Sequence, residues 1–214
     1  MIDSLAALRA LYPEASVRSR AKQTDRLDAT QRRFVEHAPL CVVASVGAGG
    51  ALADASPRGG PPGFVQVEDE RALLLPDAGG NNRLDTLENL LQDPRIGLLF
   101  LIPGVGEVLR VNGLAELRDE ARYTERFMAE GVSAPPRLVI CVAVREAYLH
   151  CPKALMRSRL WADEARAAPG TFPSMNAMLR AQLGAAIVPE TEAEAAARYR
   201  AQLVAEGYRQ GEPG

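Results

Sequence analysis

The chain has 214 residues, 47% of them hydrophobic and 24% charged, and a formal net charge of −2. This composition is typical of one globular domain with helical additions, and it lacks the basic excess of a general nucleic-acid binder. The three cysteines show neither a disulfide framework nor zinc spacing, and no run approaches the about 20 apolar residues of a membrane span. We therefore expect a cytoplasmic protein without a metal site, a nucleic-acid partner or a membrane partner.

The N-terminal part of the chain is helical in pattern, and strands begin near residue 40. Residues 3–11 and 28–38 have apolar positions at helical spacing, and Pro39 ends the second helix. LCVVASV (40–46) is apolar and β-branched, and ALADAS (51–56) alternates in polarity, so both are predicted strands. PRGGPPG (57–63) is predicted to be a loop, because its prolines and glycines interrupt a hydrogen-bonded ladder.

The strand pattern continues to residue 151. FVQVED and RALLLPD (64–77) form a predicted hairpin. Three longer runs follow, at 95–102, 107–118 and 137–151. Strands that come in hairpin pairs, without regular βαβ alternation, favour a small antiparallel β-barrel of about six strands over a doubly wound sheet with a Rossmann-type cofactor site.

One loop-to-helix segment, GGNNRLDTLENLL, can hold an anion at its helix start. Asn82 is a predicted N-cap residue, and Arg83 adds a guanidinium that can bind a phosphate bidentately. The helix is expected to turn three leucines to the core: Leu84, Leu87 and Leu91. A plain capped helix without a ligand is the alternative.

Three other segments carry candidate cationic groups. SPRGG contains Ser56 and Arg58, LRVNG contains Arg110 on an alternating strand, and CPKALMR places Lys153 and Arg157 on one helix face. A solvated surface charge is the alternative for each of these cations. Lys153 is the least expected of them, since the chain has only one other lysine.

The order SPRG, PDxxGNNRxDTLxNLLxxPRIGLLFLIPG, LRVNG and HCPKALMRSRLW resembles the pyridoxamine 5′-phosphate oxidase-like flavoproteins, in their bacterial subgroup of unassigned substrate. The resemblance covers roughly residues 25–161. It implies a mainly β fold with helices, a six-stranded antiparallel split β-barrel that binds FMN at the interface of a homodimer. Residues 1–24 and 162–214 are then helical extensions, the second packed on the barrel.

The resemblance also implies which residues bind the cofactor. Its phosphate segment matches Asn81, Asn82 and Arg83, and its arginine-bearing strand matches Arg110. The remaining implied cofactor-binding residues are Ser56, Pro57 and Arg58 on the second strand, and Lys153 and Arg157, which reach the partner's flavin or substrate cleft. The C-terminal Arg-Leu-x-Pro segment of the true oxidase has no counterpart, which argues against pyridoxamine phosphate as substrate.

No acid–base pair is evident. His37 and His150 are the two histidines, and the Cys151 that follows His150 points to the opposite face of a strand. The catalytic residues are thus unknown, and the chemistry is expected to come from the flavin. We expect an FMN-dependent oxidoreductase that moves a hydride between flavin and a small organic substrate or a nicotinamide nucleotide. The alternatives are a non-enzymatic flavin-binding or storage protein, and a split barrel that uses F420 or haem.

Overall fold

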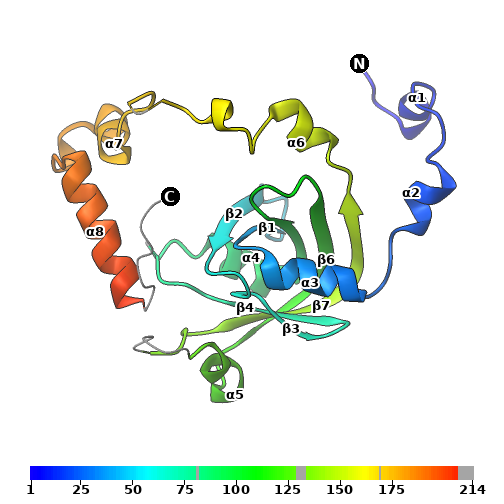
Figure 1. Ribbon diagram of the computed structural model, residues 1–214, viewed down its shortest axis with the longest axis horizontal. Helices are drawn as coiled ribbons and strands as arrows, with labels where there is room; N and C mark the ends of the chain where they lie inside the picture. The colour runs from blue at the N-terminus through cyan, green and yellow to red at the C-terminus, as the bar shows by residue number, and fades with distance from the viewer. Residues whose placement is uncertain (81, 129–133, 169, 207–214) are drawn as a thin grey trace. The chain divides into compact units, whose positions relative to one another are not determined.

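The computed structural model describes residues 1–80, 82–128, 134–168 and 170–206 (Figure 1). Its chain divides into two compact units. The first unit comprises residues 1–75, 84–116 and 141–152, and the second comprises residues 76–83, 117–140 and 153–214. Asn81 and the tail from residue 207 lie outside the described residues.

The fold is mainly β, as the sequence predicts, and is built on one seven-stranded sheet of order β2-β1-β5-β6-β7-β4-β3. The strands are β1 Leu40–Val46, β2 Ala53–Gly59, β3 Gln66–Asp69, β4 Ala72–Pro76, β5 Arg95–Leu101, β6 Val108–Arg118 and β7 Val139–His150. The pairs β1–β2, β1–β5, β3–β4 and β5–β6 are antiparallel. Each of the seven predicted strand segments corresponds to one strand of the sheet, which thus has one strand more than the barrel of about six that was expected.

Strand β2 also corrects the predicted loop at 57–63. It continues to Gly59, with Pro57 opposite Val42 and Arg58 opposite Cys41 in β1. A proline is tolerated here because β2 lies at the edge of the sheet, where the proline nitrogen can face away from the neighbouring strand. The loop begins only after Gly59.

Two helices pack on the sheet within the first unit. Helix α3, Ala29–His37, contacts β3, and helix α4, Asp85–Gln92, contacts β1 and β2. In α4 the buried leucines are Leu87 and Leu90, whereas Leu91 is 76% exposed and Leu84 is 46% exposed. The predicted set of core leucines was therefore wrong at two positions. Because α4 begins at Asp85, Leu84 precedes the helix, and Leu90, three residues after Leu87, takes the inward position.

Of the remaining helices, two precede α3 in the sequence, one follows β6 and three follow β7. Helices α1 and α2 belong to the first unit, and α5 to α8 belong to the second. They are α1 Leu5–Arg9, α2 Val17–Ala21, α5 Ala121–Thr124, α6 Lys153–Ser158, α7 Met175–Leu183 and α8 Glu192–Ala205, with 3₁₀ turns at Glu125–Phe127, Asp163–Ala165 and Gly184–Ala186. None of the helices in the described residues has the length and apolar character needed to cross a membrane. The packing of residues 162–214 on the barrel stays a prediction.

The two faces of the sheet are both rich in apolar or small residues. The inward positions of β1, β5 and β6 are buried: Cys41, Val43, Ile96, Leu98, Phe100, Leu109 and Val111. Directly paired residues share a face, and the register aligns the outward positions in rows. One row is Pro57, Val42, Leu99 and Arg110, and the next is Ala55, Ala44, Gly97 and Asn112. Outward positions that meet water in an antiparallel sheet are usually polar, so this outward face has the composition of a surface that another layer covers.

Candidate functional site

Asp54 organises the inward side of β2. Its Oδ2 accepts a hydrogen bond from Ser56 Oγ at 3.0 Å and another from Thr86 Oγ1 at 2.8 Å. Thr86 is only 2% exposed and lies in the first turn of α4. The hydroxyl hydrogen of Ser56 is thus committed to Asp54, and the Ser56 oxygen can act toward a ligand only as an acceptor.

Ser56 and Arg58 share one face of β2, because alternate residues of a strand point to the same side. Pro57 points to the other side, in the same cross-strand row as Arg110. The predicted site residues of the first unit thus fall on two sides of the sheet. Ser56 and Arg58 lie on one side, and Pro57 and Arg110 lie on the other.

The start of α4 differs from the prediction. The N-cap residue is Leu84, which has no side-chain acceptor, and the helix begins at Asp85. Asn82 lies two residues before Leu84 with φ 58°, in the left-handed region. Asn82 was therefore wrongly predicted as the cap. Asparagine suits this conformation because its short polar side chain tolerates positive φ, and the same property made it resemble a cap in the sequence.

The second unit contains Asn82, Arg83, Lys153 and Arg157. Lys153 is the first residue of α6, and Arg157 lies one turn later. Both side chains are exposed, as is that of Arg83. Whether these residues join those of the first unit in one site stays a prediction.

Arg110 lies within a group of side chains at the β6–β7 border of the outward face. Its Nη1 donates to the Tyr148 hydroxyl at 2.9 Å, and its Cζ lies 5.6 Å from the centroid of the Tyr148 ring. Lys22 Nζ lies 5.0 Å from the same centroid and donates to the backbone oxygen of Leu149 at 2.7 Å. Two cations thus approach one aromatic ring, an arrangement favoured by the ring's negative face. We call Lys22, Arg110, Tyr148 and His150 the Tyr148 cluster.

His150 completes this cluster. Its ring centroid lies 5.0 Å from that of Tyr148, and its Nε2 is buried without a hydrogen-bond partner in the described part of the chain. Burial lowers the pKa of His150 below its usual 6.5, and the positive charges of Arg110 and Lys22 lower it further. The neutral imidazole is thus favoured in this surrounding.

An irregular alternation on β7 places these side chains. The buried positions are Val142 and Val144, and then Ala147, so the inward phase shifts by one residue between them. The shift brings Glu146, Tyr148 and His150 to the side of Arg110. Arg145 and Glu146, two adjacent charged residues after a continuous apolar run, are the sequence signal that could have indicated it.

Glu146 accepts two hydrogen bonds from neutral amides. Asn112 Nδ2 donates to one carboxylate oxygen at 3.0 Å, and Gln23 Nε2 donates to the other at 2.7 Å. Sequence reasoning missed this pair of contacts, and it missed Lys22 and Tyr148 as neighbours of Arg110. The scarcity of lysine was the only available signal for Lys22, since its segment lies far from β6 in the sequence.

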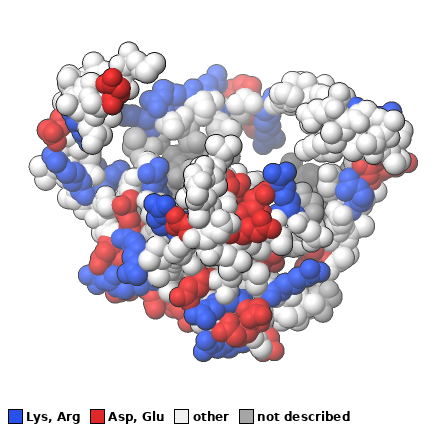
Figure 2. All heavy atoms as spheres, turned by 180° about the vertical axis from the view of Figure 1, so that it is seen from behind, with Lys and Arg blue, Asp and Glu red and all other residues white. Residues whose placement is uncertain are grey.

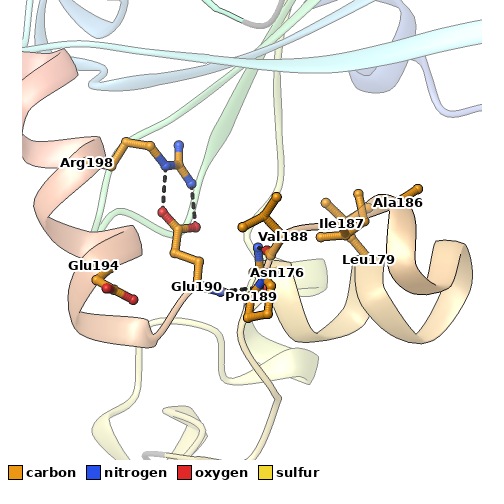
Figure 3. Close-up of a pocket in the computed structure, with 9 residues that line it drawn as sticks. All are labelled: Asn176, Leu179, Ala186, Ile187, Val188, Pro189, Glu190, Glu194 and Arg198. Atoms are coloured by element: carbon orange, nitrogen blue, oxygen red, sulfur yellow. Dashed lines mark hydrogen bonds and ion pairs between the residues drawn. The ribbon is translucent and has the colours of Figure 1, made fainter.

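The second unit contains a pocket of about 600 Å³ between α7 and α8 (Figure 3). Glu190 forms a two-bond ion pair with Arg198, at 2.8 and 3.0 Å, and Asn176 bonds the backbone on either side of Pro189. These polar groups satisfy one another and close the α7–α8 turn. None of the sequence-predicted site residues within the described part of the chain lines this pocket.

Basic and acidic side chains are interspersed over the face seen in Figure 2, in keeping with the net charge of −2. The described histidines, cysteines and acidic residues contain no cluster of three or more that could hold a metal ion.

The seven-stranded sheet with helices packed on it defines the class as a mainly β fold. Residues 27–151 match the family model described as pyridoxamine 5′-phosphate oxidase. This span is more than half of the chain and includes all seven strands. The chain belongs to the pyridoxamine 5′-phosphate oxidase family, and its fold is the predicted split barrel with seven strands. No curated protein matches the chain significantly.

Solved structures with a similar fold share little sequence with this chain. HupZ of Group A Streptococcus is 18% identical, with a TM-score of 0.47 over 57% of this chain and 93% of its own. General Stress Protein 26 of Bacillus anthracis is 12% identical, with a TM-score of 0.42 over 55% and 88% of the two chains. An FMN-binding protein of Syntrophomonas wolfei is 11% identical, with a TM-score of 0.42 over 56% and 88%. Likeness at this level carries no functional argument.

The lowered pKa of His150 predicts a pH dependence of stability. Because the folded-state pKa lies below the unfolded value of about 6.5, the contribution of His150 is present above that pH and is lost as pH falls through the folded pKa. His150→Gln should therefore give a shallower fall in the free energy of unfolding below about pH 6.5, measured by urea unfolding at a series of pH values. Equal slopes for wild type and variant would contradict the predicted pKa.

Proposed function

We propose that the protein is an FMN-dependent oxidoreductase that acts on a small organic substrate or a nicotinamide nucleotide. The observation that carries the proposal is Arg110: it lies on the strand matched to the family's ligand-binding arginine, at the border of an apolar sheet face. Neither Arg110 nor Lys22 beside it forms an ion pair with a carboxylate among the described residues. A cation at the position of Arg110 suits the phosphate or the carbonyl oxygens of FMN.

The donor set fits the phosphate of FMN at the start of α4. The N-cap residue Leu84 forms no side-chain cap hydrogen bond with the helix start, and helix N-termini attract anions. Asp85 and Glu88 in the same turn oppose an anion. The positive charge of Arg83 is therefore needed for phosphate binding there, together with Asn81 and Asn82 as neutral donors.

The outward sheet face fits the flat ring of a flavin. Small residues such as Ala44, Ala55 and Gly97 let a planar ring approach the strands closely. A bound flavin would supply hydride transfer to the reaction. The chain's own part is to hold the ring through Pro57 and Arg110 on this face, to bind the rest of the cofactor through Ser56 and Arg58 on the other side of β2, and to supply positive charge through Lys153 and Arg157.

A second copy of the chain is the proposed cover of the outward face. An obligate dimer would remove the apolar rows on β1, β2, β5 and β6 from water, and such interfaces bury above about 2,000 Å². The cofactor then lies at the subunit interface, between this face and the partner's cationic residues. The proposed compartment is the cytoplasm.

The alternatives are a flavin-binding protein without catalytic activity and a split barrel that uses F420 or haem. The visible spectrum of the purified protein distinguishes the three cofactors, since flavin, deazaflavin and haem absorb differently. A flavin spectrum that no nicotinamide nucleotide bleaches would favour the storage protein over the enzyme.

Disrupting the outward face should dissociate the dimer. Ala44→Lys puts a charge in the middle of the apolar rows, and burying an unpaired charge costs several kcal/mol. Light scattering at micromolar concentration should give the mass of one chain for this variant and twice that mass for wild type. Ala121→Lys, an exposed position at the start of α5, is the control and should remain dimeric. A monomeric wild type with flavin bound would refute the proposed assembly.

Removing the Arg83 charge should weaken FMN binding selectively. Arg83→Ala should cost about 1.5–3 kcal/mol of FMN binding, the range for hydrogen bonds to a charged group. Riboflavin lacks the phosphate and should lose much less affinity. Flavin fluorescence titrations measure both values, and equal losses for the two ligands would place Arg83 away from the phosphate.

Lys153 should tune the redox potential of the flavin. A cation beside the ring favours the reduced form, because reduction adds negative charge. Lys153→Met should lower the midpoint potential and slow reduction by NAD(P)H, with FMN affinity largely unchanged. Spectroelectrochemistry and stopped-flow reduction provide the measurements. Wild-type potential and rate in the variant would show that Lys153 has no redox role.

A further inference from the structure

The Tyr148 cluster is rich in hydrogen-bond donors that have no acceptor in the described part of the chain. Arg110 uses one of its five N–H groups, toward the Tyr148 hydroxyl. That hydroxyl accepts the bond, so its own hydrogen remains to be donated. Lys22 uses one of three ammonium hydrogens, toward the backbone of Leu149. His150 forms no hydrogen bond to the described residues.

The positive charge of the cluster is also not neutralised within the described chain. Lys22 and Arg110 lack carboxylate partners there, whereas many other arginines, such as Arg71 with Asp25, form ion pairs. Glu146 is the acid on the same side of β7, but its two oxygens accept from Asn112 and Gln23. The amides hold that carboxylate in place and occupy one acceptor site on each of its oxygens.

The cluster is held in place by the backbone around it. Thr24 and Ala147 exchange two backbone hydrogen bonds, at 3.0 and 2.8 Å, and so attach the segment that carries Lys22 to β7. Gln23 adds its bond to Glu146. Donors that are fixed before a ligand arrives lose less entropy on binding, which increases affinity.

We propose that Lys22, Arg110, Tyr148 and His150 bind the oxyanion group, a carboxylate or a phosphate, of a small ligand. An oxyanion offers several acceptor lone pairs and a negative charge. The cluster offers donors without acceptors and positive charge without a carboxylate partner among the described residues. Lys22, Tyr148 and His150 lie outside the set of residues proposed above for the flavin, and the site does not require flavin binding.

A bound oxyanion has a direct consequence for His150. Its negative charge would offset the repulsion that Lys22 and Arg110 exert on the imidazolium, and it would accept a hydrogen bond from the ring. Binding should therefore raise the pKa of His150. This consequence separates a ligand site from a purely structural cluster, whose histidine would not respond to anions.

The test is an NMR titration of the full-length protein with inorganic phosphate, at constant ionic strength maintained with chloride. The chain has two histidines, and His37→Gln assigns the imidazole signals. We expect a saturable shift of the His150 signals and a raised His150 pKa at saturating phosphate. The shift should not occur with chloride alone. A His150 signal that phosphate does not change would overturn the proposal.

Two charge variants test the role of Lys22. Lys22→Met should weaken phosphate binding about tenfold, as expected for a lost hydrogen bond to a charged group. Arg20→Met removes the same charge from an exposed position of α2, where Arg20 bonds to Ala15 and Glu14, and should leave the affinity unchanged. Equal weakening of phosphate binding by both variants would show that only the overall charge matters, and it would contradict a specific site at the Tyr148 cluster.

Repeating the titration with FMN and with riboflavin identifies the source of the oxyanion. If FMN abolishes the phosphate response and riboflavin does not, the cluster binds the cofactor's own phosphate. If the response persists with FMN bound, the oxyanion belongs to a second ligand, the substrate. A protein that binds phosphate at His150 but no flavin would support this site while refuting the flavin proposal.

Discussion

The register that joins β2, β1, β5 and β6 is the constraint on which the rest of the molecule depends. It aligns Pro57, Val42, Leu99 and Arg110 in one row and turns Cys41, Val43 and Leu98 to the opposite side. A slip by one residue would exchange the two faces. Because the inward face is the core and the outward face is also apolar, the same register determines the composition of both faces of the sheet.

The charged groups lie where this apolar surface ends. On β6 the outward positions are polar: Arg110 lies opposite Leu99, and Asn112 lies opposite Gly97. Strand β7 places Glu146, Tyr148 and His150 beside them. The polar groups thus form a border along one edge of an apolar area. A ligand with an apolar ring and an anionic group would match such a surface, since its two ends have different solvation requirements.

The strands could be predicted from the sequence because each has a clear period of two or a continuous apolar run. Six of the seven predicted segments needed no correction, and the seventh, β2, was cut short because Pro57 indicates a loop unless the strand is known to lie at an edge. Edge position is a property of the assembled sheet. The error at Asn82 has a similar origin. Whether an asparagine caps a helix or takes a left-handed loop conformation depends on where α4 begins and packs in the folded chain.

The candidate site was predictable only in part. Arg110 was predicted to point away from Leu109 and Val111 on an alternating strand, and this orientation is confirmed, whereas its role in a site stays a prediction. Its neighbours Lys22 and Tyr148 could not be found, because they come from segments 88 residues before it and 38 residues after it. Their proximity depends on the shifted alternation of β7 and on the Thr24–Ala147 bridge, which are tertiary features without a local sequence pattern.

The proline at the edge of the sheet also restricts how two copies of the chain can meet. Pro57 lacks an N–H group, so β2 cannot offer a complete row of donors to a strand from another molecule. The opposite edge strand, β3, is only four residues long and ends with the acidic pair Glu68 and Asp69. Growth of the sheet from chain to chain is thus disfavoured at both edges, and strand pairing between molecules has no favourable route to open-ended fibres.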